Sequence, residues 1–377
     1  MHVTHPILRL HLLLPFSLPD ITHAKLVLHN LYKPALDKLV ERATFVERVI
    51  GDDFQRTLPH ERWVARCFGV GRADALAGPC QQINDVVPLA PYMLLADGGN
   101  PQDAVWACVE PVHMRVVHNH LVLVDPGMLQ LSQNDAAGLL AVARPLIRGL
   151  GVKLEAPTPL RWYLSSEQLG LLASASPLRA LGRNIDIWLP HEAYTGHRPR
   201  MWMKLQNEIQ MAWFGHPINQ AREARGLPAI NSLWLYAQGR MTTVSKPFER
   251  VLSRAAATRG LAISSSAALE TLPDTFDILR KQATTQAADH TLNNGMTLVE
   301  LDQLSAPFIQ QDWPRFRAMF SALGDDWFSP ALVALKRREL VQLAITLCSD
   351  TGSTTLVIRA LDIKKFWRRR SFSSLLR

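Results

Sequence analysis

The spacing of hydrophobic positions changes repeatedly along the chain between strand-like and helical patterns. The apolar run Leu10–Phe16 predicts a first core strand, and Leu31–Ala43 and Pro59–Phe68 predict amphipathic helices. Further strands are predicted at 92–96, 104–109, 116–124, 157–166, 230–236, 297–301 and 354–358, and further helices at 132–150, 178–189, 246–259, 276–287, 313–321 and 330–347. This alternation predicts an α/β fold with a mixed or largely parallel sheet flanked by helices.

The most informative pattern is Lys204–Leu235, which reads KLQNEIQMAWFGHPINQAREARGLPAINSLWL. Apolar residues at helical spacing predict a helix that Pro217 stops, because the residue before a proline is disfavoured in the α region. A second short helix follows over Asn219–Arg225, with Gly226 as its C′ residue. The apolar and aromatic run 230–236 then predicts a buried strand.

Two interpretations of the polar residues in this stretch are open. Amides and ion pairs beside apolar neighbours are costly to bury unless they are hydrogen-bonded, so they can form a structural network between helix and strand. Alternatively they line a pocket for a polar or phosphorylated ligand or a protein partner. The candidate ligand-binding residues are Asn207, Gln210, His216, Asn219, Arg222 and Asn231, with Arg161 nearby.

Three loops follow predicted strands, at 97–100, 125–127 and 238–240. Ligands of open α/β sheets bind beyond the carboxyl ends of the strands, so parallel strands would bring these loops to one rim. Arg240, beside Gly239, would bind an anion there through its guanidinium group and a free backbone N–H. The alternative is that these loops are ordinary surface turns.

A histidine-rich stretch, EPVHMRVVHNHLVLVD, occupies residues 110–125. His118 and His120 are two residues apart, so on a strand both point to one face. With His113 and Asp125 they offer nitrogen and oxygen ligands for a divalent metal. The alternative is an edge strand with solvated histidines, since thirteen histidines in the chain make chance clustering easy.

The bulk composition is that of a globular protein: 377 residues, 47% hydrophobic and 20% charged. We expect one compact domain over residues 1–363, with 1–7 as a disordered leader. Residues 364–377 form a basic, aromatic tail. Its cations are Lys364, Lys365, Arg368, Arg369 and Arg370, which flank Phe366 and Trp367. Such a tail can bind nucleic acid, lie on an anionic membrane surface or simply be solvated.

Other patterns restrict the class of protein. The chain has no GxSxG, Walker A or GxGxxG motif, so the usual hydrolase, P-loop and dinucleotide signatures are missing. Its four cysteines are scattered, which is typical of a reducing compartment. No apolar run approaches the ~18 residues of a membrane span. No cofactor is expected from these patterns.

Several motifs together resemble the RpfE-type regulatory proteins of proteobacteria, over most of the chain. They are PVHMRV (111–116), PLRWYL (159–164), GRNIDIWLP (182–190), LQNEIQM (205–211), HPINQAREARGLPAINSLWL (216–235) and FWRRR (366–370). The resemblance implies a cytoplasmic protein linked, in plant-associated relatives, to the regulation of pathogenicity factors such as extracellular enzymes and polysaccharide.

Relatives of that family are often labelled as similar to cofactor-independent phosphoglycerate mutases. That label implies an alkaline-phosphatase-like fold in which two divalent metals activate a Ser or Thr. Here the first strand ends LLLPFSLPD, without the Asp-Gly of the mutase pattern, and Asp289-His290 lacks the following glycine. We therefore expect a degenerate form of this fold and a non-catalytic regulatory protein. The alternative is a metal-dependent phosphoglycerate-mutase-like enzyme or phosphoesterase.

Overall fold

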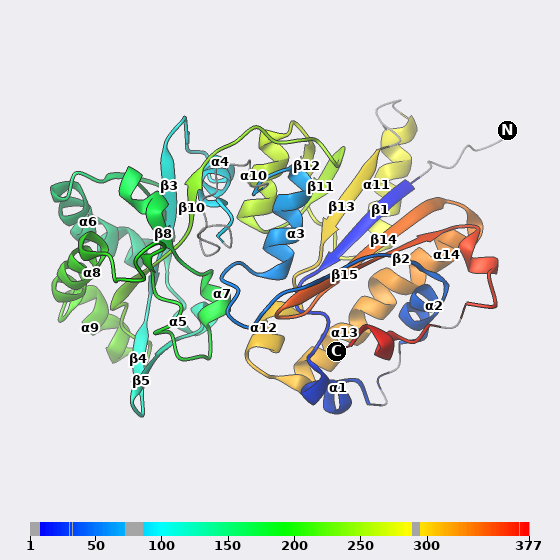
Figure 1. Cartoon of the computed structure of the whole chain (residues 1–377), viewed down its shortest axis with the longest axis horizontal. Coiled ribbons are helices and arrows are strands. Elements are labelled where there is room, and N and C mark those ends of the chain that lie inside the picture. The colour runs from blue at the N-terminus through cyan, green and yellow to red at the C-terminus, as the bar shows by residue number, and fades with distance from the viewer. Residues whose placement is uncertain are drawn as a thin grey trace. The chain divides into compact units, whose positions relative to one another are not determined.

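The computed structural model describes residues 8–29, 31, 33–71, 86–288, 295–368 and 370–376. Its contacts divide the chain into two compact units, whereas a single domain is the expectation from sequence. Unit 1 comprises Met1–Phe54 and Ser245–Arg377, and unit 2, Gln55–Val244, is inserted between these two segments (Figure 1). The leader predicted at residues 1–7 and the Asp289-His290 pair lie outside the described residues.

Unit 1 is built on a seven-stranded sheet with the strand order β12-β11-β13-β1-β14-β15-β2. Parallel pairing joins β12 to β11, β11 to β13, and β1 to both β13 and β14. Antiparallel pairing joins β15 to β14 on one side and to β2 on the other. The sheet is thus mixed and largely parallel, which confirms the predicted fold class. The strands are β1 (Leu8–Leu14), β2 (Thr44–Ile50), β11 (Arg250–Leu252), β12 (Ala268–Glu270), β13 (Met296–Glu300), β14 (Leu340–Cys348) and β15 (Gly352–Arg359).

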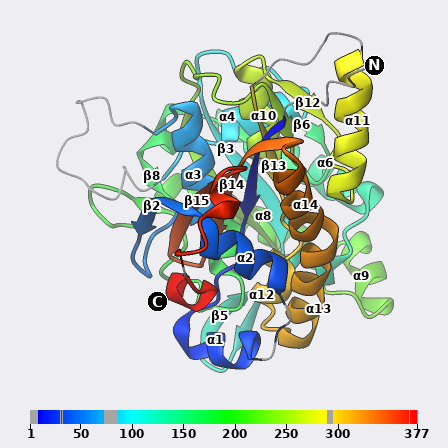
Figure 2. The same ribbon diagram turned by 90° about the vertical axis from the view of Figure 1, so that its right-hand side faces the viewer.

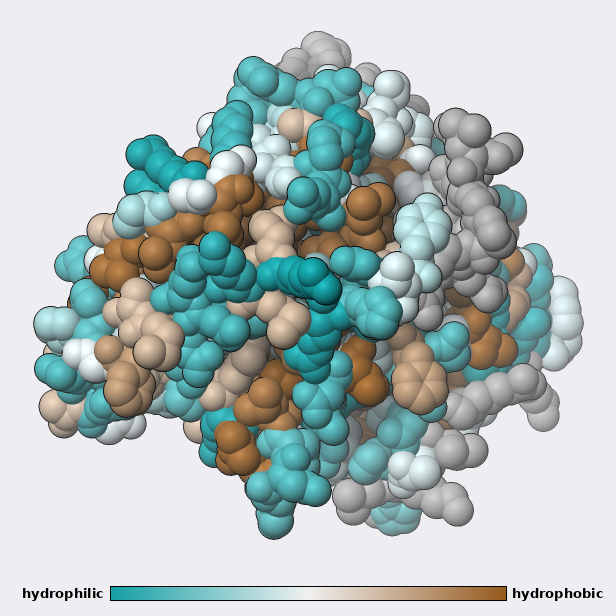
Figure 3. Space-filling view, turned by 60° about the vertical axis from the view of Figure 1, so that its left-hand side comes forward, coloured by the Kyte–Doolittle hydropathy of each residue, from teal (hydrophilic) through white to brown (hydrophobic). Residues whose placement is uncertain are grey.

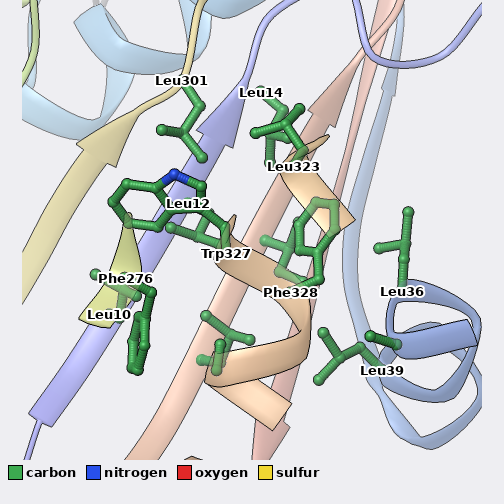
Figure 4. Packing of buried hydrophobic residues seen from close by; sticks show 14 of the residues in the cluster. Leu10, Leu12, Leu14, Leu36, Leu39, Phe276, Leu301, Leu323, Trp327 and Phe328 are labelled. Atoms are coloured by element: carbon green, nitrogen blue, oxygen red, sulfur yellow. The ribbon is translucent and has the colours of Figure 1, made fainter. Parts of the chain in front are cut away.

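Helices cover both faces of this sheet, which explains why β1 is an almost continuous apolar run. One face packs against α2 (Pro34–Arg42), α11 (Phe276–Ala288), α13 (Trp313–Leu323), η3 (Gly324–Phe328) and α14 (Ser329–Arg337). Figure 2 shows α2, α13 and α14 on the same side of the sheet, and Figure 4 shows Trp327 beside Leu12 of β1 and Phe328 beside Leu323. Val299 of β13 belongs to the core cluster under these helices, so the next residue, Glu300, points to the opposite face of the sheet. Glu300 forms a hydrogen bond with Thr258 of α10 (Ala256–Ser264), which places this helix on that opposite face.

Unit 2 is built on a four-stranded antiparallel sheet with the order β10-β3-β7-β6. Its strands are β3 (Val105–Val112), β6 (Lys153–Thr158), β7 (Arg161–Ser165) and β10 (Ser232–Arg240). Helices α6 (Gln133–Gly149) and α8 (Arg200–Trp213) cover one face and enclose the buried rings of Trp162, Trp202 and Trp213. The chain also forms α9 (Pro217–Ala224) and a small hairpin of β4 (Met114–Val117) and β5 (His120–Leu123).

The most strongly patterned predictions are confirmed. Helix α3 (Pro59–Phe68) has the predicted bounds, and Ser132 caps α6 by accepting a hydrogen bond from the Asp135 backbone N–H at 3.0 Å. In the stretch 204–235, α8 ends before Pro217, Gly226 follows α9 with φ 74°, and β10 comes next. Gly226 follows α9 because glycine readily adopts the left-handed conformation, whereas α8 already ends at Trp213 and Pro217 is the first residue of α9.

Other predictions are wrong where short apolar runs were ambiguous. Residues 92–96 belong to helix α4 (Ala90–Ala96), which starts with Pro91 in its first turn. The helix predicted at 330–347 ends at Arg337, with Arg338 in the left-handed region at φ 61°, and the remainder is strand β14. Residues 246–259 hold β11 and the start of α10, and 178–189 are helical only in α7 (Pro177–Ala180).

On the face drawn in Figure 3, hydrophobic surface is broken up by hydrophilic side chains, as is normal because about half of a folded surface is apolar. Among the described residues, no helix combines the length and apolarity needed to cross a membrane.

Candidate functional site

The buried members of the predicted polar cluster of residues 204–235 form hydrogen bonds with neighbouring backbone groups. The Asn219 side chain donates to the carbonyl oxygens of Trp213 and Ile230 at 2.9 and 2.8 Å and accepts from the Ile230 N–H at 2.8 Å. The guanidinium of Arg222, which is fully buried, donates to the carbonyls of Pro228 and Leu129 and pairs with Asp135 at 3.3 Å. These contacts fasten α9 to its surroundings.

The remaining members are equally committed or lie on the surface. Asn231 exchanges two hydrogen bonds of 2.8 Å with the backbone of Met114, and His216 caps α9 by accepting from the Ile218 N–H. Asn207 and Gln210 are exposed on α8. The geometry therefore favours the structural-network interpretation of this stretch over the pocket.

Arg161 belongs to a different polar cluster, on the sheet face opposite α6 and α8. It donates through Nε and Nη2 to the two carboxylate oxygens of Asp97, both at 2.8 Å. Tyr163, which shares the face of Arg161 as predicted, donates its hydroxyl to Asp97 at 2.6 Å. Asp97 follows the last residue of α4, so the cluster ties that helix to β7.

Strands β3 and β10 extend this cluster with three further ionisable groups. Tyr236 donates to the carboxyl group of Glu110 at 2.7 Å, and Cys108 lies two residues before Glu110 on the same face. Burial raises the pKa of Glu110 and raises that of the Cys108 thiol well above its ordinary value. The thiol therefore stays protonated, which argues against a reactive cysteine.

The three predicted loops do not meet at a rim, because the sheet of unit 2 is antiparallel. Residues 97–100 follow helix α4, and residues 238–240 lie inside strand β10. Arg240 already has carboxylate partners: it pairs with Glu167 at 2.6 Å and Asp103 at 3.3 Å. The guanidinium that we expected to bind an external anion thus pairs with carboxylates of the protein itself.

The predicted metal ligands are distributed over a hairpin and its flanks. His118 lies in the turn between β4 and β5 with φ 56°, not on a strand with His120, so the same-face argument fails. His113 bonds the Ala229 carbonyl oxygen through Nδ1 at 2.6 Å, and Asp125 caps the short helix α5 (Pro126–Leu129). In the described ranges, no three His, Cys, Asp or Glu side chains are grouped so that they could hold a metal.

The C-terminal segment packs onto unit 1. Phe372 and Leu375, in η5 (Phe372–Leu375), belong to the main core cluster. Among the predicted nucleic-acid ligands, Lys365 pairs with Asp362, and Arg368 donates to the Arg42 carbonyl oxygen at 3.0 Å. Lys364 and Arg370 are exposed, and Arg369 lies outside the described residues.

A cavity of about 280 Å³ lies in unit 1 beside the ends of two parallel strands. Leu18 and Pro19 line it just beyond β1, and Ser349 lines it just beyond β14. The Leu18 N–H donates to the Cys348 carbonyl oxygen at 3.1 Å, which holds the two strand ends together. This is the edge at which α/β sheets bind ligands, and the volume is near the lower limit for small-molecule sites.

The polar side of this cavity consists of one arginine and several hydroxyl groups. Arg48 of β2 pairs directly with Thr354 of β15, so both side chains lie on one face of the sheet. Arg48 donates through Nη2 to the Leu375 carbonyl oxygen at 2.9 Å. Thr354 is almost fully buried. Ser349, Thr351 and Ser353 add hydroxyls, and Val49, Ile50, Leu375 and Leu376 supply apolar walls.

A second buried polar group lies at the same edge of the sheet, at the end of β13. The carboxyl group of Glu300 accepts a hydrogen bond from Ser253 Oγ at 2.6 Å and another from Thr258. Burial raises the pKa of Glu300, and these two hydrogen bonds oppose the rise. Ser253 also accepts from the Ala255 N–H, so it fixes the turn from β11 into α10.

Replacing Glu300 by Gln should change how stability depends on pH. The folded state keeps the Glu300 proton to a higher pH than the unfolded state, so this group makes unfolding easier as pH rises above the ordinary pKa of 4.5. The free energy of unfolding of Glu300→Gln minus that of wild type should therefore increase from acidic to neutral pH. Urea denaturation at several pH values measures this difference. Glu223→Gln, at an exposed position, is the control. A pH-independent difference between Glu300→Gln and wild type would contradict the expectation.

Sequence reasoning missed the cavity because its residues come from distant segments. Arg48, Thr354 and Leu18 are far apart in the chain, and none stands in a recognised motif. The weak signal in the sequence was Arg48 in one strand and the threonine-rich run at 351–355 in another. Its meaning depends on the register of β2 against β15, which the sequence does not give.

Comparison with known proteins gives a fold likeness only. No protein-family model matches the chain, and no curated protein matches it. The structure is similar to the PH0037 protein from Pyrococcus horikoshii, with a TM-score of 0.51 and 14% identity over 94% of this chain and 88% of that one. A cofactor-independent phosphoglycerate mutase from Thermoplasma acidophilum matches with a TM-score of 0.39 and 12% identity, over 93% and 90% of the two chains.

The likeness to the mutase, with a TM-score of 0.39, is too weak to support a conclusion. The likeness to the PH0037 protein, at 14% identity, shows a shared fold and nothing about function. None of these comparisons shows the RpfE-type family. The chain therefore shares its overall α/β fold with the PH0037 protein over nearly its whole length.

Proposed function

We propose that this protein is a non-catalytic regulatory protein whose unit 1 binds a small polar ligand with an anionic group. The observation that carries the proposal is the composition of the cavity at the ends of β1 and β14. Its walls include the cation of Arg48 and the hydroxyls of Thr351 and Thr354, but no carboxylate, imidazole or thiol. Such walls can bind an anion but offer no acid–base pair, and no ligand set for a metal.

The size and polarity of the cavity indicate the class of ligand. About 280 Å³ fits a compact metabolite, and the apolar walls fit a carbon skeleton beside the anionic group. A phosphorylated or carboxylated metabolite would receive charge-assisted hydrogen bonds from Arg48 and neutral ones from the hydroxyls. The resemblance to RpfE-type regulatory proteins supports a role in regulation rather than in metabolism itself.

Binding can be tested with a panel of phosphorylated and carboxylated metabolites. We expect at least one to raise the melting temperature of the full-length protein and to bind in calorimetry. Replacing Arg48 by Gln should weaken that binding roughly ten- to a hundred-fold, because a charge-assisted hydrogen bond contributes about 1.5–3 kcal/mol. Thr354→Val should weaken it less, since it removes a neutral hydroxyl and keeps the shape.

The matched control is Arg315→Gln, which removes an exposed arginine of unit 1 that does not line the cavity. Equal affinities for Arg48→Gln and Arg315→Gln would place the ligand elsewhere and overturn the proposal. Turnover of a phosphate ester in the presence of added divalent metal would favour the phosphoesterase alternative instead.

A further inference from the structure

Two large aromatic side chains are held in solvent by a turn near the C-terminus. Phe366 and Trp367 are 73% and 66% exposed, and their ring centroids lie 5.4 Å apart at 81°. They follow η4 (Asp362–Lys364) and precede η5, and both of these short helices pack against α2. We call Phe366 and Trp367 the aromatic turn. Leaving two such rings in water gives up much of the hydrophobic stabilisation that burial would provide.

A buried arginine clamps the backbone on both sides of the aromatic turn. Arg42, at the end of α2, is 5% exposed and donates through Nη1 to the carbonyl oxygens of Lys365 and Arg368, the latter at 2.9 Å. Arg368 returns hydrogen bonds of 3.0 Å to the Arg42 carbonyl oxygen and to Thr44 Oγ1. These reciprocal bonds fix the turn in place, so its two rings are presented by a rigid support.

The surroundings of the aromatic turn are strongly basic. Residues 361–370 contain five basic residues against one acidic residue, Asp362. Asp362 is buried and pairs with Lys365, whereas Lys364 and Arg370 are exposed. Leu361 is a third exposed apolar side chain in this segment, at 65%. Exposed apolar side chains and exposed cations that alternate within one short segment have the chemistry that binds an anionic lipid surface.

We propose that the aromatic turn, with Leu361, Lys364 and Arg370, docks this protein on the surface of an anionic lipid bilayer. The perpendicular rings do not form a platform for successive stacked bases, and a leucine adds nothing to stacking, so single-stranded nucleic acid fits less well. A stable protein partner needs about 800 Å² on each side. A fluid interface needs only a few inserted side chains and opposite charge, and it accepts Phe, Trp and Leu alike.

Sedimentation with lipid vesicles tests the proposal on the full-length protein. We expect binding to vesicles of mixed phosphatidylcholine and phosphatidylglycerol that weakens as salt is added, and little binding to phosphatidylcholine alone. The double variant Phe366→Ser, Trp367→Ser should lower the partition coefficient at least about ten-fold, because both apolar side chains leave the interface. Its urea midpoint should equal that of wild type, since both positions are exposed.

Phe214→Ser is the matched control, because it removes an equally exposed ring, 85% accessible, from unit 2. This variant should bind vesicles as wild type does. Equal vesicle binding by the double variant and wild type would overturn the proposal, and so would equal binding to neutral vesicles. If the double variant instead loses affinity only for a single-stranded oligonucleotide, measured by fluorescence anisotropy, the occupant is nucleic acid and the lipid proposal fails.

Discussion

Replacing Arg222 by Ala should destabilise the protein by about 3–5 kcal/mol, the range found when one partner of a buried ion pair is removed. The side chain is fully buried and holds three groups at once: the Pro228 and Leu129 carbonyl oxygens and the Asp135 carboxylate. Its loss would remove the guanidinium donor from both carbonyl groups, that of the buried Leu129 included, and would leave Asp135, which is 20% exposed, with Arg225 alone. Urea denaturation of both proteins measures the change.

Arg225 provides an unusually close control for this experiment. It pairs with the same carboxylate, Asp135, at 3.4 Å, but its side chain is 56% exposed. Exposed ion pairs contribute about 0–1 kcal/mol, so Arg225→Ala should fall in that range. Similar losses for Arg222→Ala and Arg225→Ala would mean that Arg222 does not organise unit 2, and the structural-network interpretation would fail.

A second large effect is expected for Trp213→Ala, at about 3–5 kcal/mol. Trp213 is fully buried between α8 and α6, where its ring meets that of Trp162 edge to face at 6.0 Å. Its Nε1–H donates to the Leu139 carbonyl oxygen at 3.1 Å. Alanine would leave a large cavity and would remove the additional hydrogen bond to the Leu139 carbonyl oxygen. The free energy of unfolding, from urea denaturation, tests this loss.

The neighbouring residue supplies the control. Phe214 ends the same helix and is exposed, so Phe214→Ala should change stability by no more than about 0.5 kcal/mol. If Phe214→Ala lowered the free energy of unfolding as much as Trp213→Ala, the Phe214 ring would have to be buried. That result would contradict the orientation of α8 on the sheet.

The sequence by itself determined those elements whose ends depend on local backbone chemistry. Pro217 located the break between α8 and α9, Gly226 located the end of α9, and Ser132 located the start of α6. The helical spacing of the apolar residues also identified the buried face of α8: Trp202, Leu205, Ile209 and Trp213 are buried, and Ala212 is half-buried. Capping, proline and glycine act within a few residues, so no knowledge of distant contacts was needed.

The same reasoning could not assign the roles of the polar residues. Asn219, Arg222 and Asn231 were equally consistent with a pocket and with a network, because the choice depends on which carbonyl groups lie within reach. Arg161 could not be matched with Asp97, since the two are separated by 64 positions and meet only when α4 packs on the sheet.

Only the tertiary structure decided the topology and the position of the candidate site. Strand pairing between segments as distant as β1 and β14 places Leu18 beside Ser349, and the β15–β2 register places Arg48 beside Thr354. It also decided that the basic C-terminal segment is anchored through Phe372 and Arg42 rather than being a free tail. These outcomes depend on the pairing of strands and packing of surfaces that are remote in the chain, and such long-range contacts leave no local pattern in the sequence.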